Sequence, residues 1–320
     1  MMRVRVRTPS RLHFSMVDLR GDLGRIYGSA GVAIDRPNIV LEAEPAPRLT
    51  VTGFRAERAR EYADTVLEES GITGGAKVNI VSDMPEHSGF GSGTQLALAV
   101  GTAISEIHGL DYSPERLALL LNRSRRSGVG TYAFKHGGFI VDGGHRVGTT
   151  GDFPPLIFRH DFPEDWLFII GLPDTAQGSS GKREVDAFKN LEPPPTCLAG
   201  DVARILLMQM IPALLEEDAE AFGAAMTGLD LKFGEHWKEV QGGLYSSPVI
   251  EKGVEFLLKT GALGAGQSSW GPAFYGLVQG EGRAEDVRSQ LEGFLNEGGR
   301  SGTAFVAHAQ NEGAEVTVTE

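Results

Sequence analysis

The stretch PEHSGFGSGTQ, residues 85–95, places three glycines and two serines between an apolar segment typical of a strand and a run rich in alanine and leucine. A strand, a glycine-rich loop and a helix in this order turn backbone N–H groups toward a phosphate, and the helix N-terminus adds roughly half a positive charge. Glycine permits left-handed backbone and close approach of a ligand. The candidate phosphate-binding residues here are Gly89, Gly91, Ser92, Gly93, Thr94 and Gln95.

The spacing of this stretch excludes two common phosphate-binding motifs. No Lys-Ser or Lys-Thr pair follows the glycines, as a Walker A loop requires, and the glycines are not spaced as in a Rossmann fingerprint. Taken alone, the stretch is either an anion-binding loop of another class or a plain turn.

The segments around the loop predict alternating strands and helices. For the first half we predict strands at 4–8, 38–44, 77–82 and 136–144, and helices at 56–70, from about 94 to 107 and from Ser113 onward. For the second half we predict strands at 166–170, 273–278, 303–309 and 315–319, and helices at 198–229 with an interruption near Pro212, at 247–261 and at 284–296.

A weakly patterned stretch with several prolines, residues 151–163, is the best candidate for a domain boundary. We therefore predict one domain at 1–155, which contains the phosphate-binding loop, and a second at 156–320. The mixture of helices and short strands indicates an α+β fold.

Composition narrows the class of partner. The net charge of −12 argues against a nucleic-acid-binding surface. The single cysteine, Cys197, has no internal partner, which favours a reducing cytoplasm, and no apolar run indicates a membrane-spanning segment. Positive charge gathers beside glycines at 123–130 and 179–184, as expected for an acidic protein that binds a small anionic substrate.

Two more segments carry dense polar groups. Residues 10–35 hold Arg11, His13, Asp18, Arg25 and Tyr27 among glycines, which is more than a turn requires. Residues 261–278, GALGAGQSSWGPAFYGLV, form a second glycine-rich segment that leads into a strand. The alternative interpretation of this second segment is a helix C-cap at Gly261 followed by a hairpin turn.

The three segments in this order resemble the GHMP kinase superfamily over essentially the whole chain. Pro9-Ser10-Arg11 matches its first motif, P-x-R. Residues 85–93 match the second, P-x3-G-x-G-S-S, with Gly93 where a second serine is usual, and residues 264–268 match the third, a late G-x-G-G loop. The resemblance implies a GHMP-kinase-like fold, with an N-terminal domain like ribosomal protein S5 and a ferredoxin-like C-terminal domain.

Within the superfamily, the chain resembles the β-ribofuranosylaminobenzene 5′-phosphate synthases. The resemblance rests on RLHFSMVDLRGDLGRIYGSAGVAI (11–34), PEHSGFGSGTQLALAV (85–100), RRSGVGTYAFKHGGFIVDGG (125–144) and GQSSWGPAFYGLV (266–278). It implies a pentosyltransferase of methanopterin biosynthesis that condenses phosphoribosyl pyrophosphate with 4-hydroxybenzoate or 4-aminobenzoate. A β C-riboside forms, and carbon dioxide and pyrophosphate leave. Mg²⁺ is the implied cofactor, and a homodimer is expected because the superfamily often dimerises.

One departure from the kinase pattern supports this branch. Many GHMP kinases carry an aspartate in an SG-[VA]-D segment near the middle of the first domain. The comparable stretch here is Ser127-Gly128-Val129-Gly130, with glycine in place of the aspartate. A kinase without its presumed base should phosphorylate poorly.

The resemblance and the chemistry together name candidate site residues. The catalytic candidates are His13, Arg25, His87 and Arg126, with His136 as a further histidine that could take a proton from a phenol. Besides the loop residues above, the candidates for binding phosphate, carboxylate or the benzoate ring are Arg11, Tyr27, Lys182, Arg183, Gln267, Ser268, Ser269 and Trp270. The metal candidates are Asp18 and Glu86, with Asp142 as a third. For each of them the alternative is structural: a solvated charge, a hydrogen-bonded histidine or a core aromatic ring.

Two other functions remain open at this point. One is an ATP-dependent small-molecule kinase of the same superfamily, and the other is a sensor that binds a sugar phosphate without turnover. The glycine at position 130 argues against the first, and the dense charges of residues 10–35 argue against the second.

Overall fold

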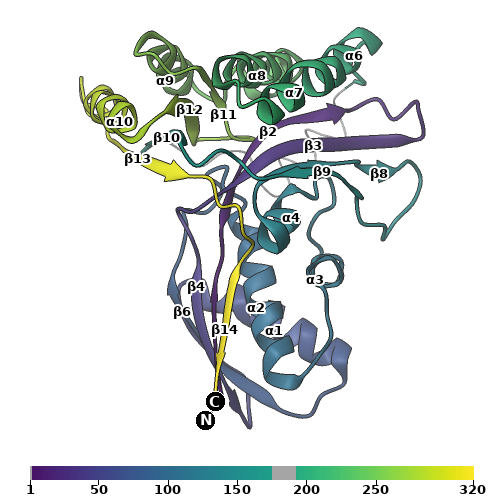
Figure 1. The fold of residues 1–320 in the computed structure, drawn as a ribbon. Helices are drawn as coiled ribbons and strands as arrows, with labels where there is room; N and C mark the ends of the chain where they lie inside the picture. The colour runs from purple at the N-terminus through teal and green to yellow at the C-terminus, as the bar shows by residue number, and fades with distance from the viewer. Residues whose placement is uncertain (1, 175–191) are drawn as a thin grey trace.

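The computed structural model describes residues 2–174 and 192–320. Lys182 and Arg183, two of the predicted substrate-binding residues, lie outside the described residues. The described chain forms three β-sheets with helices packed on their faces, and the two ends of the chain lie side by side (Figure 1).

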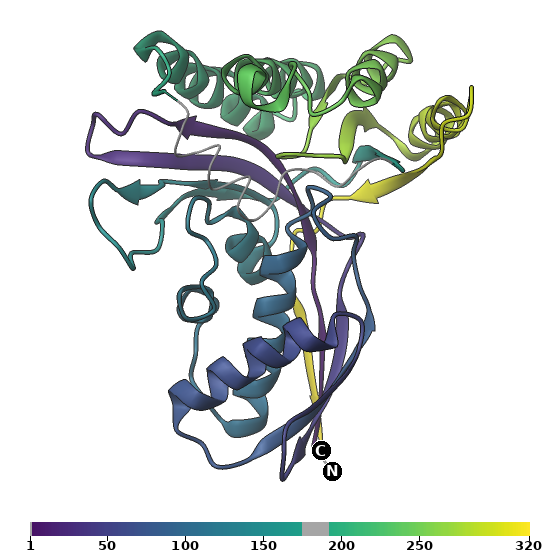
Figure 2. The ribbon, with the colours of Figure 1, turned by 180° about the vertical axis from the view of Figure 1, so that it is seen from behind.

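The first sheet has the strand order β14-β1-β4-β6-β5, and all its pairs are antiparallel except β5 with β6. Its strands are β1 (Arg3–Arg7), β4 (Val40–Ala46), β5 (Thr50–Gly53), β6 (Gly75–Ser82) and β14 (Glu315–Thr319). In β1 the arginines are exposed and the valines are buried, so the predicted alternation is confirmed. Helices α1 (Ala56–Ser70) and α2 (Ser92–His108) cover the inner face, as Figure 2 shows from behind.

The second sheet contains the strands that reach the candidate site. Its order is β2-β3-β7-β9, and the short strand β8 (His145–Arg146) also pairs with β3. The main strands are β2 (Ser10–Asp18), β3 (Arg25–Ile34), β7 (Phe139–Asp142) and β9 (Leu156–His160). The predicted strands include none between residues 9 and 37. The structure gives one reason for a glycine: a Cβ on Gly31 would lie 2.3 Å from the Leu12 carbonyl oxygen of the neighbouring strand.

The helices α3 (Pro114–Leu120) and α4 (Val129–His136) connect the second sheet to α2. The Ser113 side chain accepts a hydrogen bond from the Arg116 N–H, so the predicted start of the third helix is confirmed.

The third sheet is antiparallel and ferredoxin-like. Its order is β11-β12-β10-β13, formed by β10 (Trp166–Pro173), β11 (Gly264–Gln267), β12 (Phe274–Gln279) and β13 (Gly302–His308). Helices α8 (Ala219–Gln241) and α9 (Pro248–Lys259) precede the β11–β12 pair, and α10 (Glu281–Leu295) precedes β13. This is the β-α-β-β-α-β succession of a ferredoxin-like fold, so the expected fold class is confirmed.

The helical region 196–241 differs from the prediction. The break lies at residues 216–218 and not at Pro212, because Asp218 caps α8 by accepting the Ala221 N–H and Glu217 has left-handed backbone with φ 56°. Pro212 instead lies just after a π-helical turn at 206–210, in a helix that continues to Leu215. Helix α6 (Thr196–Ile205), the π-helical turn η1 (Leu206–Met210) and α7 (Ile211–Leu215) run on as one helix.

By length and composition alone, this helix, Thr196–Leu215, is long and apolar enough to cross a membrane. From the sequence, no segment of that kind is expected. Part of its apolar surface packs inside the protein, since Leu206, Met210 and Leu214 are buried. Lys232 of α8 forms an ion pair with Asp201 at 3.1 Å.

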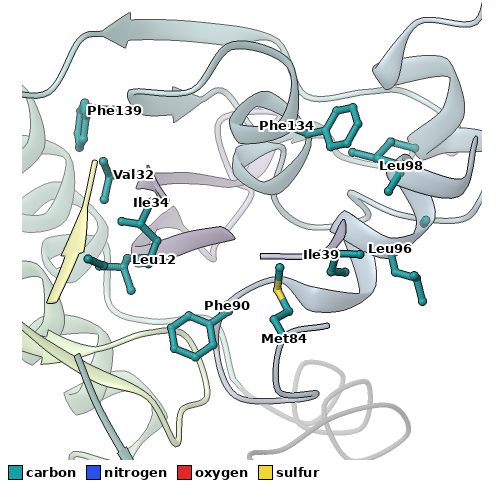
Figure 3. Close-up of a cluster of buried hydrophobic side chains, with 14 of the residues drawn as sticks. Leu12, Val32, Ile34, Ile39, Met84, Phe90, Leu96, Leu98, Phe134 and Phe139 are labelled. Atoms are coloured by element: carbon teal, nitrogen blue, oxygen red, sulfur yellow. The ribbon is translucent and has the colours of Figure 1, made fainter. Parts of the chain in front are cut away.

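Strand pairing crosses the predicted boundary at 155. Strand β9 pairs with β7, and β14 returns to pair with β1. The hydrophobic core is continuous across the same boundary. One buried cluster contains the residues of Figure 3, among them Leu12, Phe90 and Phe139, together with Phe168 and Phe222 from the second half.

Candidate active site

The three motif segments of the sequence meet at one place. The Arg11 N–H donates to the Phe90 carbonyl at 3.1 Å, which joins β2 to the glycine loop. The buried Ser268 hydroxyl donates to the Gly89 carbonyl at 2.6 Å and accepts the His13 N–H at 3.1 Å. A single side chain from the third motif therefore joins the first motif to the second.

The glycine loop has the backbone that the sequence predicts. Gly89 and Gly91 have φ 89° and 80°, in the left-handed region that favours glycine. A Cβ on Gly89 would lie 2.4 Å from the Ser268 carbonyl oxygen. Gly91 is the N-cap of α2, so the helix begins at Ser92, and Gly93 and Thr94 lie in its first turn. The first N–H groups of a helix lack the usual partner four residues earlier, and Ser92, Gly93 and Thr94 line the cavity described next.

A cavity of about 610 Å³ opens over this helix N-terminus. Its walls come from the loop before α2, the start of α1, the segment after α3 and the third motif. The lining residues are Arg11, Arg55, Glu57, Arg58, Tyr62, Glu86, His87, Ser88, Gly89, Gly91, Ser92, Gly93, Thr94, Arg123, Ser269, Trp270 and Gly271. Most of the predicted phosphate-binding loop and parts of the first and third motifs therefore share one cavity.

Three arginines of this cavity are not among the predicted site residues. Arg55 is held by Asp83 and lies 3.4 Å from Glu86, so its charge is largely compensated. Arg58 pairs with Glu61 at 2.6 Å and its Nε donates to the Tyr62 hydroxyl at 3.1 Å. The half-buried Arg123 contacts Thr94, with its Nε 3.4 Å from the hydroxyl oxygen. The available signal for Arg123 was its place in the basic segment 123–130.

His13, the first candidate for a base, is buried beneath the cavity and is not among its lining residues. Burial, with the neighbouring Arg11 charge, lowers the pKa of His13 to about 3. Its ring is therefore neutral at physiological pH and is a weak acceptor for a phenol proton. His87 is exposed, lines the cavity and has left-handed backbone with φ 53°. His136 lies at the end of α4, where its ring stacks on Tyr132, and it is not among the lining residues.

Three predicted residues gather elsewhere. Asp18, Arg25 and Tyr27 line a second, mostly apolar cavity of about 310 Å³ between the β2–β3 hairpin and the helix at 203–211. Arg25 donates from Nε and Nη2 to the carbonyls of Gly143 and Gly144 at 2.7 and 2.6 Å, which fastens β3 to the turn after β7. Arg126 is half-buried and is not among the lining residues of either cavity.

The metal candidates do not share one site, since Asp18 and Asp142 line the second cavity and Glu86 lines the first. Asp18 accepts the Arg20 N–H at 2.6 Å at the tip of the hairpin, whereas Glu86 lies beside Arg55 in the other cavity. Burial raises the pKa of Asp142, and its carboxylate accepts from Ser29 Oγ at 2.5 Å and from the Gly128 N–H at 2.9 Å, which fixes the start of α4. Within residues 2–174 and 192–320, no group of three or more His, Cys, Asp or Glu side chains could hold a metal ion.

The predicted glutamines, Gln95 and Gln267, form hydrogen bonds to neighbouring elements and do not line the cavity. The Gln95 amide donates to the Gly130 carbonyl at 2.8 Å, so it joins α2 to α4. The Gln267 N–H donates to the buried Asp230 carboxylate at 2.8 Å, and its side-chain amide donates to the Ser269 carbonyl at 2.8 Å. Trp270 packs edge-on against Trp237, with ring centroids 4.7 Å apart.

Gly130, the residue at the place of the kinase aspartate, lies in α4 against Thr94. A Cβ there would lie 3.4 Å from Thr94 Cγ2, an ordinary contact distance. A side chain could therefore begin there without a clash, and this position beside the predicted phosphate-binding loop carries no carboxylate.

Comparison with known proteins identifies the family of the chain. The profile of the GHMP kinases N-terminal domain matches residues 57–138, and that of the GHMP kinases C-terminal domain matches residues 210–297. The chain is 35% identical to β-ribofuranosylphenol 5′-phosphate synthase of Methanothermobacter thermautotrophicus, over 94% of this chain and 98% of that protein. It is 33% identical to the synthase of the same name from Archaeoglobus fulgidus, over 98% of this chain and all of that one. The chain belongs to this family of enzymes.

Solved structures of kinases share the fold. The crystal structure of homoserine kinase from Cytophaga hutchinsonii aligns with a TM-score of 0.72 and 17% identity, covering 98% of this chain and 97% of that chain. A mevalonate kinase aligns with a TM-score of 0.68 and 16% identity, covering 96% and 99%. At these identities the likeness shows the GHMP kinase fold and nothing about the substrate.

Proposed function

We propose that this enzyme transfers the 5-phosphoribosyl group of phosphoribosyl pyrophosphate to the ring carbon of 4-hydroxybenzoate that bears the carboxylate. The observation that carries the proposal is the near-full-length relationship to synthases named for a ribofuranosylphenol 5′-phosphate product. That name favours an acceptor whose para substituent is hydroxyl, so 4-aminobenzoate becomes the alternative acceptor. The step would serve methanopterin biosynthesis in the cytoplasm.

The proposed reaction balances without a redox partner. The bond between the anomeric carbon and pyrophosphate breaks, and the leaving group takes the electron pair. The ring carbon attacks the oxocarbenium-like ribose, so a C–C bond forms with inversion. The bond to the carboxylate then breaks, its electron pair returns to the ring, and carbon dioxide leaves. A para oxygen donates electron density to the attacking carbon.

The residues of the large cavity suit the departure of pyrophosphate. The N-terminus of α2, Arg11 and Arg123 present N–H donors and positive charge where negative charge develops, which is the electrostatic contribution an enzyme can make to such a step. Trp270 and Tyr62 give the same cavity aromatic surface for an acceptor ring. His87 is the histidine within this cavity that could accept the proton of the para hydroxyl.

Mg²⁺ stays a prediction, and we derive no step through it. Asp18 and Glu86 do not fit a common protein site because they line different cavities. Any magnesium would therefore have to be bound largely by the phosphate oxygens of the substrate, as is usual for this ion.

One assay tests the proposal against both alternatives. The protein is incubated with phosphoribosyl pyrophosphate, Mg²⁺ and 4-hydroxybenzoate labelled in the carboxylate, and released labelled carbon dioxide is measured. We expect release with 4-hydroxybenzoate and none with plain benzoate, which lacks the donating group. ATP consumption with a small alcohol instead would indicate the kinase, and binding without turnover would indicate the sensor.

A further inference from the structure

Gly91 and Gly93 each leave room for one arginine at the start of α2. A Cβ on Gly91 would lie 3.3 Å from Arg11 Cγ, and a Cβ on Gly93 would lie 3.0 Å from Arg123 Nη2. Arg11 approaches from β2, and Arg123 approaches from the segment after α3. The helix N-terminus therefore has a guanidinium group on two sides.

Gly93 has no other evident reason to be glycine. It lies within the first turn of α2, and its φ is not in the left-handed region. Glycine is a poor helix former, so the helix itself would favour another residue. The atoms nearest to a Cβ at this position all belong to the Arg123 guanidinium.

Arg123 is held in place by unusual backbone. Asn122 and Ser124, its two neighbours, both have left-handed conformations, with φ 59° and 57°. Such conformations are costly in residues other than glycine and cluster at functional sites. The Arg123 N–H donates to the Ala118 carbonyl at 2.6 Å, which closes the turn after α3.

None of the carboxylates in residues 2–174 and 192–320 pairs with Arg123. Within the part of the chain that the structure describes, its side chain contacts the Thr94 hydroxyl and no carboxylate. Arg55 and Arg58, on the α1 side of the cavity, are both paired with carboxylates. Of these three arginines, Arg123 therefore has the guanidinium best placed to meet an anion at the α2 N-terminus.

We propose that Arg123 binds the pyrophosphate group of the substrate together with the α2 N-terminus, and that Gly93 is the specificity-determining residue that admits it. This inference rests on the proposed function. The Cβ of a serine at position 93, the usual residue in the kinase motif, would lie 3.0 Å from Arg123 Nη2, so the guanidinium would have to shift from its present place. Glycine at 93 and arginine at 123 would then act as one unit that distinguishes this anion site from a kinase phosphate loop.

A double-mutant cycle tests the unit by titration calorimetry with inorganic pyrophosphate and Mg²⁺. The variants are Arg123→Ala, Gly93→Ser and the two combined, with Gly93→Ala as a second variant in case serine prevents folding. Arg125→Ala is the matched control, since Arg125 is exposed and, among the described residues, bonds to Asn122 in the same segment. Thermal unfolding establishes that each variant is folded.

We expect Arg123→Ala to weaken pyrophosphate binding by about 10- to 100-fold, as for the loss of a charge-assisted contact. Gly93→Ser should weaken binding in the parent by about tenfold, and by less than about twofold once Arg123 is absent. Arg123→Lys should restore only part of the loss, because lysine cannot present two parallel donors. Arg125→Ala should change the affinity by less than about twofold.

Unchanged affinity in Arg123→Ala, or an equal loss from Gly93→Ser in both backgrounds, would overturn the inference. These outcomes are separate from the fate of the proposed function. If the enzyme releases carbon dioxide but the effects of Arg123→Ala and Gly93→Ser on affinity are additive, the synthase proposal stands and only the joint role of Gly93 and Arg123 is refuted. A coupled cycle without carbon dioxide release would retain the paired anion site and remove the synthase proposal.

Discussion

Gly91 combines two demands that only glycine meets without cost. Its φ of 80° is left-handed, and its Cβ position is crowded by the Arg11 side chain at 3.3 Å. Gly109, at the other end of the same helix, is also left-handed, with φ 64°, but nothing lies within 4 Å of its Cβ position. A comparison of substitutions at the two glycines therefore distinguishes the effect of backbone strain from the effect of a side chain that crowds Arg11.

We expect Gly91→Val to abolish measurable pyrophosphate binding while the protein stays folded. Both Gly91→Val and Gly109→Val should lose about 1–3 kcal/mol of stability, because each forces a β-branched residue into left-handed backbone. Only Gly91→Val should lose binding, because only that side chain displaces Arg11. Calorimetry and denaturant unfolding measure the two effects. Equal affinity in the two variants would contradict the assignment of this loop as the anion site.

His13 shows how a sequence candidate changes its role once packing is known. Its histidine type and its place in a polar segment suggested a base, but β2 pairs with β3 and buries the ring. We expect His13 to govern stability rather than the pH dependence of turnover. The folded pKa of about 3 lies below the unfolded value, so the unfolded chain binds the proton first as the pH falls.

The neutral His13 ring therefore contributes to the free energy of unfolding above pH ~6.5. This contribution is lost progressively between pH ~6.5 and ~3, by about 1.4 kcal/mol per pH unit at most. We expect His13→Gln to lack this part of the pH dependence, which denaturant unfolding at several pH values would show. The pH profile of carbon dioxide release should be the same in shape for both proteins. An acidic limb that disappears in His13→Gln would restore His13 as the base.

At the scale of elements, the sequence predicted correctly the helices whose ends are set by residues within or next to the helix. Helix α1 has the predicted bounds, α2 begins two residues earlier and ends one later, and α3 has its Ser113 cap. The hairpin of β2 and β3 was missed because its glycines serve contact with a neighbouring strand, which a single segment does not reveal. Arg123 was missed as a cavity residue for the same reason, since the segment after α3 reaches α2 only through tertiary packing.

Asp230 joins α8 to β11 with a buried carboxyl group. Burial raises its pKa to about 7, although the Gln267 N–H and the Tyr245 hydroxyl partly offset this by stabilising the charged form. The folded protein therefore holds the proton up to a higher pH than the unfolded chain does. The stability contributed by the neutral carboxyl is fully present below pH ~4 and is lost as the pH rises to about 7.

We expect Asp230→Asn to gain stability relative to the parent as the pH rises from ~4 to ~7, by up to about 1.4 kcal/mol per unit. The asparagine carbonyl can still accept the Gln267 N–H, so the contact between α8 and β11 is retained. In the parent this trend opposes that of His13, so only differences between parent and variant isolate either group. A stability difference that is constant with pH would show that Asp230 stays ionised in the folded protein.

At the scale of the whole molecule, the sheets do not respect a division of the chain at residue 155. Strand β14 completes the first sheet and β9 completes the second. Phe222 of α8 packs edge-on against Phe14 and Phe139, with centroids 6.2 and 5.8 Å away, so the helix layer of the second half rests on the second sheet. The proposed anion site lies where all three motifs meet, and its geometry depends on both halves.

We therefore expect one cooperative unfolding transition rather than two. The chain supplies independent probes, since Trp166, Trp237 and Trp270 all lie in the second half and report it by fluorescence. Hydrogen exchange at the α1 and α2 amides reports the first half.

Phe222→Ala should lower the free energy of unfolding by about 3–5 kcal/mol, because it opens a cavity among buried rings. The unfolding midpoints that the two probes report should fall together. Exposed Phe54, in the turn before α1, provides the control, and Phe54→Ala should leave the midpoint nearly unchanged. Persistent protection of α2 after the tryptophan signal is lost would mean that the halves unfold separately, and that the site can lose its third motif while its phosphate-binding loop remains.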